Sequence, residues 1–395
     1  MVGATVGVFA CKPSTESTAP RPSSSALASE ASGRLPDVIN KFIRVVRAED
    51  FSAHIDGEGT FVIDTETTAI SVHADMHGDD WMLSMDDGTG PIESGFVDGH
   101  GFLLDGQGWA LTGQTETEAL ARVGVSFRNS VVLRDIGADA SRAGARKLAI
   151  LTWFGVYPAS LQDGTITGIS ETKEELVVSV DSDGRPFGGR YTLEFAAKKA
   201  GRDIRVTGLI DYTFDRVGQV TIEPPVAVPP GVSPGVTLPP VMSSPAWTTE
   251  DAGLGTTLEF PGMPTRSTES RPDSATNTNV DVHLLTFQSA ASPKFSASVL
   301  RYESQPPNVT EFLAIVRTND EGILGGPVIG EIELTGPGSG AEFIVNGAKG
   351  LFRSRSMLMG DVTITWSVGG SILDVGSTIA DRFLDSATLA GPTTP

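Results

Sequence analysis

A proline-rich segment near the middle of the 395-residue chain is the feature that most restricts its fold. Residues 224–245 read PPVAVPPGVSPGVTLPPVMSSP. Proline has no backbone N–H to donate to a sheet and cannot continue a helix, so this segment should form an extended, semi-stiff spacer. We therefore expect two domains, over about 34–223 and 246–390, with few contacts between them.

The N-terminal residues suggest a lipid anchor. The single cysteine, Cys11, ends a short apolar run from Val2 to Ala10, and Val8-Phe9-Ala10-Cys11 resembles a bacterial lipobox. We interpret residues 1–11 as a truncated signal peptide and lipobox, with Cys11 as the lipidation site. A start codon placed too late would explain why no Lys or Arg precedes the apolar run. The alternative is a free cysteine near a disordered terminus.

The segment after Cys11 has the composition of a tether. Residues 12–33 are almost all Ser, Thr, Ala, Pro and Glu, so they cannot bury enough apolar surface to offset the entropy of ordering. Such a coil has an r.m.s. reach of about 25 Å, from ~5–6 Å times the square root of its length. This favours lipidation, and predicts an extracytoplasmic protein anchored to the bacterial cell membrane.

Charge and composition argue against several partners. The chain carries a formal charge of -20, which repels phosphate backbones, so we expect no nucleic-acid partner. No run of 18 uncharged apolar residues is present to span a membrane as a helix. One cysteine cannot build a thiolate metal site, and no motif indicates a cofactor.

No motif in the sequence has the context that catalysis requires, and we predict that the protein is not an enzyme. Residues 231–235 read GVSPG and satisfy the G-x-S-x-G pattern of serine hydrolases. That elbow needs a strand before the serine, a helix after it and a backbone N–H just after the serine. Here the next residue is Pro234, and the setting is the proline-rich spacer, so the match is accidental.

The densest group of possible metal ligands is His73-Ala-Asp75-Met-His77-Gly-Asp79-Asp80. In a strand, alternation would place His73 and His77 on one face, where both could bind a metal ion, and we retain them as weak metal candidates. A solvated strand end explains the same residues without a metal. Asp181-Ser-Asp183-Gly184 resembles the start of a calcium loop, but Thr192 stands where the closing Glu belongs.

The first domain should be a meander of strands opened by one helix. Apolar residues recur at helical spacing after Pro36, and Tyr191, Leu193 and Phe195 alternate as in a half-buried antiparallel strand. Tight turns at regular spacing predict a sheet that curls into an open barrel. The expected strands cover residues 51–56, 60–65, 69–76, 81–86, 101–104, 165–171, 175–181, 190–196, 203–211 and 212–217.

One segment of this domain, residues 147–157 (KLAILTWFGVY), is apolar on every side. Core packing is one interpretation. The other is a lid or mouth that faces a bound apolar ligand.

The second domain should layer helices on an antiparallel sheet. Asn308 and Glu311 have the spacing of a capping box before Phe312, and a second helix is indicated by Ile379 and Phe383. The expected strands cover residues 256–260, 280–287, 295–302, 328–334, 341–345, 350–359 and 362–368.

Both domains show family resemblances. Residues 211–225, DYTFDRVGQVTIEPP, look like the closing segment of LolA-like lipoproteins of the LppX and LprG type, and the opening helix and strand run agree over roughly 34–225. The resemblance implies a half-barrel that encloses an apolar cavity for acyl chains or glycolipids. Residues 258–264, 295–302, 340–343 and 381–386 resemble the PsbP/Mog1-like α+β sandwich, which implies protein contacts or no known activity.

Together these patterns predict a β-rich α+β protein, with an N-terminal open antiparallel half-barrel with covering helices and a C-terminal α+β layered sandwich. We expect a membrane-anchored envelope lipoprotein that binds or carries a lipid or glycolipid. The alternative is an adaptor that contacts envelope proteins and has a solid first domain. The candidate cavity residues are the large aromatics Trp81, Phe102, Trp109, Trp153, Phe154 and Tyr212.

Overall fold

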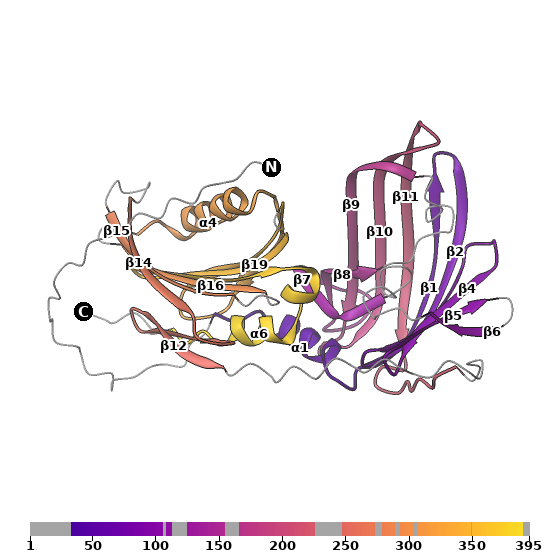
Figure 1. Ribbon diagram of the computed structural model, residues 1–395, viewed down its shortest axis with the longest axis horizontal. Coiled ribbons are helices and arrows are strands. Elements are labelled where there is room, and N and C mark those ends of the chain that lie inside the picture. Colours follow the sequence, from indigo (N-terminus) through magenta and orange to yellow (C-terminus); the bar gives the residue numbers. More distant parts are fainter. Residues whose placement is uncertain are drawn as a thin grey trace.

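The protein is β-rich and is built around two large antiparallel sheets, as the sequence predicts (Figure 1). The computed structural model describes residues 33–105, 108–112, 125–154, 166–225, 247–272, 279–288, 293–302, 306–348 and 350–389. One sheet has eleven strands and the other seven. No helix among these residues is long and apolar enough to cross a membrane.

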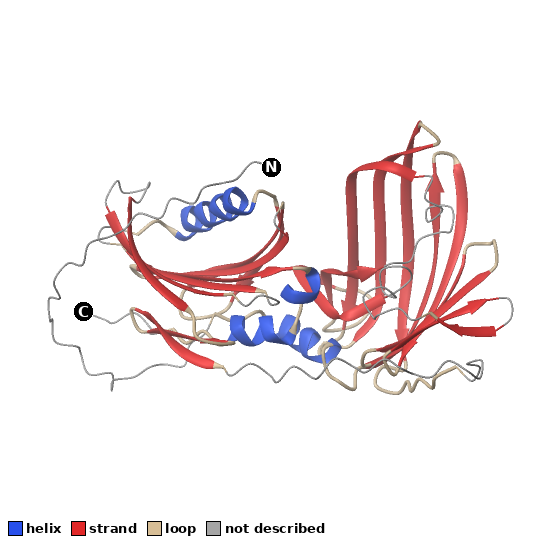
Figure 2. Cartoon of the chain, in the orientation of Figure 1, coloured by secondary structure: helices blue, strands red, loops and turns tan. Residues whose placement is uncertain are grey.

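The eleven-stranded sheet follows the order β6-β5-β4-β3-β2-β1-β11-β10-β9-β8-β7. Its neighbours are consecutive in the chain except at the centre, where β1 and β11 pair. The edge strands β6 and β7 do not pair with each other, so the sheet is open. Figure 2 shows that β9–β11 and β4–β6 run in different directions, so the sheet is strongly twisted. The bounds are β1 Ser52–Ile63, β2 Glu66–His77, β3 Asp80–Asp86, β4 Pro91–Val97, β5 His100–Asp105, β6 Gly108–Leu111, β7 Val125–Ala138, β8 Arg146–Phe154, β9 Ile166–Val180, β10 Pro186–Lys199 and β11 Arg202–Asp215.

Strand β1 is continuous through Gly57 and Gly59, although the sequence predicts two separate strands over 51–56 and 60–65. Gly57 faces the ring of Tyr212 on β11, and a Cβ at position 57 would lie only 2.5 Å from Tyr212 Cε1. A glycine inside a strand often marks such a close approach, which local sequence does not reveal. Strand β11 alternates strictly between exposed and buried residues along its length from position 203, as expected for a sheet with one buried face.

The apolar segment 147–157 is largely a strand of this sheet, not a separate lid. It forms most of β8, and Leu148, Ala149 and Ile150 are buried. Core packing therefore explains the described part of the segment. Residues 155–157 lie outside the described residues.

The seven-stranded sheet follows the order β14-β15-β16-β20-β19-β18-β17. Helix α4 lies on one face, whereas α6 and the separate β12–β13 hairpin lie on the other (Figure 2). The expected capping box is present, because Asn308 Oδ1 accepts a hydrogen bond from the Glu311 backbone N–H. The bounds are β12 Thr248–Gly253, β13 Thr256–Phe260, β14 Thr265–Pro272, β15 Asn279–Phe287, β16 Lys294–Arg301, α4 Val309–Leu324, β17 Val328–Leu334, β18 Ser339–Gly347, β19 Gly350–Met359, β20 Val362–Gly370, α5 Ile372–Val375 and α6 Thr378–Asp385.

Contacts between the two halves are extensive, so the expectation of few contacts is wrong. Arg34, just before helix α1 (Asp37–Val46), exchanges two backbone hydrogen bonds with Thr335, just after β17. Gly330 of β17 lies so close to Leu133 of β7 that a Cβ on the glycine would be 2.7 Å from the Leu133 Cα. One hydrophobic cluster contains buried residues of both sheets and of α1.

Candidate functional site

The inner face of the eleven-stranded sheet carries two of the predicted cavity aromatics. Tyr212 pairs with Gly57, Gly57 pairs with Val72, and Val72 pairs with Met85 of β3. Residues paired directly across strands share a face, and Trp81 shares the face of Met85 because it lies four residues earlier on β3. Trp81 and Tyr212 are both buried in the main hydrophobic cluster.

Two other candidates lie on the opposite face. Gly95 pairs with Met82, the neighbour of Trp81, and Phe102 pairs with Gly95. Phe102 is therefore directed away from Trp81, and it is absent from the main cluster although it is buried. Trp109 pairs with Leu104 on this same face and is only half-buried. The structure thus does not bring all four aromatics to one surface.

The remaining predicted residues fall outside what the structure describes. The backbones of Trp153 and Phe154 end β8, but their side chains are not among the described ones. Cys11 also lies outside the described residues.

Polar groups on the inner face are few. Glu174 of β9 is paired with Leu193 on this face and accepts a hydrogen bond from the Tyr191 hydroxyl at 2.9 Å, and burial raises its pKa. The indole N–H of Trp81 is buried without a hydrogen-bond acceptor among the described residues, although the side chain is only 5 % exposed. Burial also raises the pKa of the Tyr212 hydroxyl well above its ordinary value. A buried donor without an acceptor costs about 1–3 kcal/mol, so a ligand atom that accepts this hydrogen bond would be stabilised there. The face suits an apolar ligand with one such acceptor.

Of the two histidine candidates, His73 hydrogen-bonds a carboxylate, and its neighbour in this group is His54. His73 Nδ1 lies 2.5 Å from Asp56 Oδ1, a contact that lowers the pKa of Asp56. His54, not His77, is the second histidine here, with its Nδ1 2.7 Å from Asp75 Oδ1. In the described part of the chain, no group of three or more His, Cys, Asp or Glu is arranged to hold a metal ion.

A small pocket of about 170 Å³ lies beside this pair on the same face. Trp109, Ser84 and Glu93 contribute to its walls. The pocket is half open and mixed in polarity, so it differs from the buried, apolar inner face.

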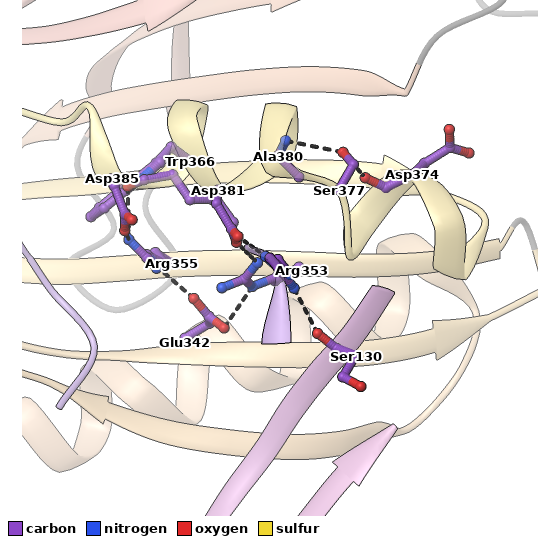
Figure 3. A network of polar contacts seen from close by, with 12 residues as sticks. Ser130, Glu342, Arg353, Arg355, Trp366, Asp374, Ser377, Ala380, Asp381 and Asp385 are labelled. Carbon is purple, nitrogen blue, oxygen red and sulfur yellow. Dashed lines mark hydrogen bonds and ion pairs between the residues drawn. The ribbon is translucent and has the colours of Figure 1, made fainter. Parts of the chain in front are cut away.

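A buried network of charges occupies the junction between the two halves (Figure 3). Glu342 of β18 accepts hydrogen bonds from Arg353 Nε at 2.7 Å and from Arg355 Nε at 2.6 Å. The arginines extend to α6, where Arg353 Nη1 lies 2.5 Å from Asp381 Oδ1 and Arg355 Nη1 lies 2.6 Å from Asp385 Oδ1. Glu342, Arg353 and Arg355 are at most 1 % exposed.

The N-terminal half enters this network through Arg47, at the end of α1. Its guanidinium pairs with Asp381, and its Nη2 donates to the backbone oxygen of Ser130 on β7 at 2.6 Å. Burial, followed by repulsion from Arg353, lowers the pKa of Arg47 to about 9, so it stays charged at neutral pH. Burial disfavours the charge of Glu342, but Arg353 and Arg355 outweigh it and lower its pKa.

The positive charges of three arginines therefore balance the negative charges of three carboxylates at the junction. A groove of about 620 Å³ runs along it between α1 and α6. Arg44 and Arg47 line it from α1, and Thr378, Asp381 and Asp385 from α6. The arrangement fixes the relative position of α1, β7 and α6, and it includes no metal-binding cluster among the described residues.

Sequence reasoning missed this network. A signal existed: Glu342 lies between Ala341 and Phe343 in an otherwise apolar strand, and Arg353 and Arg355 alternate within the expected strand 350–359. Charged residues in a buried strand are rare unless they are paired. The partners on α1 and α6 could not be identified without the fold.

A comparison with protein-family models and with curated proteins finds no match for this chain.

Proposed function

We propose that the protein is a membrane-anchored envelope lipoprotein that binds or carries a lipid or glycolipid on the inner face of its eleven-stranded sheet. The observation that carries the proposal is the buried, largely apolar surface around Trp81 and Tyr212, where the indole N–H of Trp81 has no acceptor among the described residues. Ligand sites are commonly apolar clefts with a few placed polar groups, and this surface has that composition.

The finer architecture is part of the proposal. We infer that the twisted, open sheet forms a half-barrel with a concave apolar face, and that the C-terminal half is an α+β layered sandwich. Each methylene of an acyl chain gains about 0.8 kcal/mol on burial, so a handful of methylenes would outweigh one side-chain contact of about 1.5–3 kcal/mol. The resemblance of residues 211–225 to LolA-like lipoproteins favours the same ligand class.

The anchor is proposed on the N-terminal sequence alone. Cys11 would carry the diacylglycerol, and residues 12–33 would hold the folded part near the outer face of the membrane. The anchored lipid and the carried lipid are separate: the first is covalent and survives denaturation, whereas the second is released by it.

The direct test is mass spectrometry of lipid extracted from the purified protein under denaturing conditions. A carrier should release a stoichiometric non-covalent lipid from the wild type and less from Trp81→Ala. The matched control is Trp109→Ala, which changes an aromatic on the opposite face and should leave the yield unchanged. Absence of lipid from wild-type protein would count against the carrier function.

The second candidate function is an adaptor for envelope proteins. The observation in its favour is the groove of about 620 Å³, lined by charged side chains from both halves. Charged, partly open grooves suit polar partners better than acyl chains. Wild-type protein that carries no lipid would leave this candidate as the better account.

A further inference from the structure

Helix α1 closes one end of the apolar face. Ile39, Phe42 and Val46 of the helix are buried in the same cluster as the inner-face aromatics. Gly184, in the turn between β9 and β10, packs directly against the helix, because a Cβ there would lie 2.5 Å from the Lys41 carbonyl carbon. The helix therefore lies where β9 and β10 meet, at the end of the sheet nearest α6 (Figure 1).

Both ends of α1 are fixed to the C-terminal half. Ahead of the helix, Arg34 and Thr335 exchange two backbone hydrogen bonds of 2.8 Å each. At its other end, the C-cap residue Arg47 pairs with Asp381, which is also bound by Arg353. Moving α1 away from the apolar face would require separating buried Arg47 from Asp381, which is costly because it leaves uncompensated charge.

A different contact joins the two sheets directly. Gly330 of β17 packs against Leu133 of β7, and α5 also contacts β7. These contacts do not involve α1, so the halves can remain joined while the helix loosens. The Arg47–Asp381 pair, together with the Arg47 hydrogen bond to Ser130 of β7, holds the C-terminal end of α1.

We propose that the C-terminal half regulates the ligand site by holding α1 against the end of the apolar face. This inference rests on the proposed lipid-binding function. The Arg47–Asp381 pair sets how often α1 moves away, so weakening the pair speeds both entry and exit of an acyl chain. The apolar surface that provides affinity is unchanged, so exchange rates change more than equilibrium affinity.

The test uses the full chain loaded with cis-parinaric acid, a fluorescent fatty acid, and mixed with excess phosphatidylcholine vesicles. Asp381→Asn should raise the release rate about tenfold, the effect of ~1.4 kcal/mol on a barrier. Backbone hydrogen exchange in α1 should become faster in the same variant. The matched control is Asp211→Asn, which removes an exposed pair with Arg190 at 2.6 Å and should change neither quantity.

Three outcomes separate the two proposals. Faster release and faster α1 exchange in Asp381→Asn alone support the regulation. An Asp381→Asn variant that binds the probe but keeps the wild-type release rate overturns the regulation and leaves lipid binding intact. Wild-type protein that does not bind the probe defeats both proposals.

A second variant covers the case in which Asp381→Asn does not fold. Arg44→Cys and Thr378→Cys, made together in a Cys11→Ser background, place thiols on opposite walls of the groove. Joining them with a short bismaleimide should slow release of the probe, because α1 is then tied to α6. Each single-cysteine variant, treated in the same way, is the control. Bridged protein that releases the probe as fast as these controls contradicts the inference.

Discussion

The two sheets bury their interiors by different means. The eleven-stranded sheet buries aromatic and aliphatic side chains, and its buried donor on Trp81 lacks an acceptor among the described residues. The seven-stranded sheet buries Glu342, Arg353 and Arg355 on its α6 face, where each charge has a partner. A paired network fixes one geometry, whereas an apolar face with an unsatisfied donor can accept a ligand.

The difference indicates a division of roles. The charge network of the C-terminal half holds the end of α1 through Arg47, and the apolar side chains of α1 pack into the hydrophobic cluster of the N-terminal half. The predictions that follow test the contrast from its largest expected effect to its smallest.

The largest effect should come from removing the centre of the network. Glu342→Ala leaves Arg353 and Arg355 buried without their shared carboxylate, so it should lower the free energy of unfolding by about 3–5 kcal/mol. Urea denaturation measures this. Replacing all three together, by Glu342→Leu, Arg353→Met and Arg355→Met, should cost much less, because apolar side chains of similar volume need no pairing. Equal losses in the single and triple variants would contradict this account of the network.

A second effect concerns the α4 face of the same sheet, where the largely buried carboxyl of Asp320 lies beside Ser354 of β19. Burial raises the pKa of Asp320 from 3.8 to about 6. The folded state thus binds the proton more tightly than the unfolded chain. The contribution of the Asp320 carboxyl to stability should be greatest below about pH 4 and fall by about 3 kcal/mol as the pH rises through 6, at ~1.4 kcal/mol per pKa unit.

Asp320→Asn should remove that part of the pH dependence and stabilise the protein at pH 7. The measurement is the unfolding free energy of both proteins at several pH values. The matched control is Asp203→Asn, whose side chain is 89 % exposed and should change little. A variant with the wild-type pH profile would show that the Asp320 carboxyl does not titrate as proposed.

The smallest effect tests packing in the eleven-stranded sheet. Gly57→Ala places a methyl group 2.5 Å from the Tyr212 ring, so it should cost about 1–3 kcal/mol through overpacking. Gly188→Ala is the control on β10, where the nearest atom to the added methyl is Tyr212 O at 3.5 Å. Thermal unfolding should separate the two. Similar melting temperatures would mean that the Tyr212 ring moves aside at no cost.

Local features of the fold were predictable from the sequence. The expected ranges 328–334 and 350–359 coincide with β17 and β19, because each is a continuous run of strand-forming residues between glycines or turns. The Asn308–Glu311 capping box is also local and was found. Strands β4, β6, β7, β8, β12 and β14 were missed. β4, β6 and β12 are short, β7 and β14 carry many polar residues, and β8 is apolar on every side, so none shows a clear strand alternation.

The candidate site depended on information that is not local. A shift of one residue moves a side chain to the other face of a sheet. The strand register places Phe102 and Trp81 on different faces of the sheet, although both are aromatic residues in strands. The same limitation hid the partners of Arg353, since Asp381 lies on a helix 28 residues away and Arg47 enters from the other half. Composition alone could identify neither the face on which each aromatic lies nor the partners of Arg353.

The central claim is that an acyl chain lies against Trp81 on the inner face of the eleven-stranded sheet. Quenching of tryptophan fluorescence by a bromine-labelled fatty acid tests it most directly, because bromine quenches only rings that it contacts. The account predicts strong quenching in wild-type protein and in Trp247→Phe, which alters a tryptophan of the other half, and a large loss of quenching in Trp81→Phe. Equal quenching in Trp81→Phe and wild type, or none in either, would contradict it.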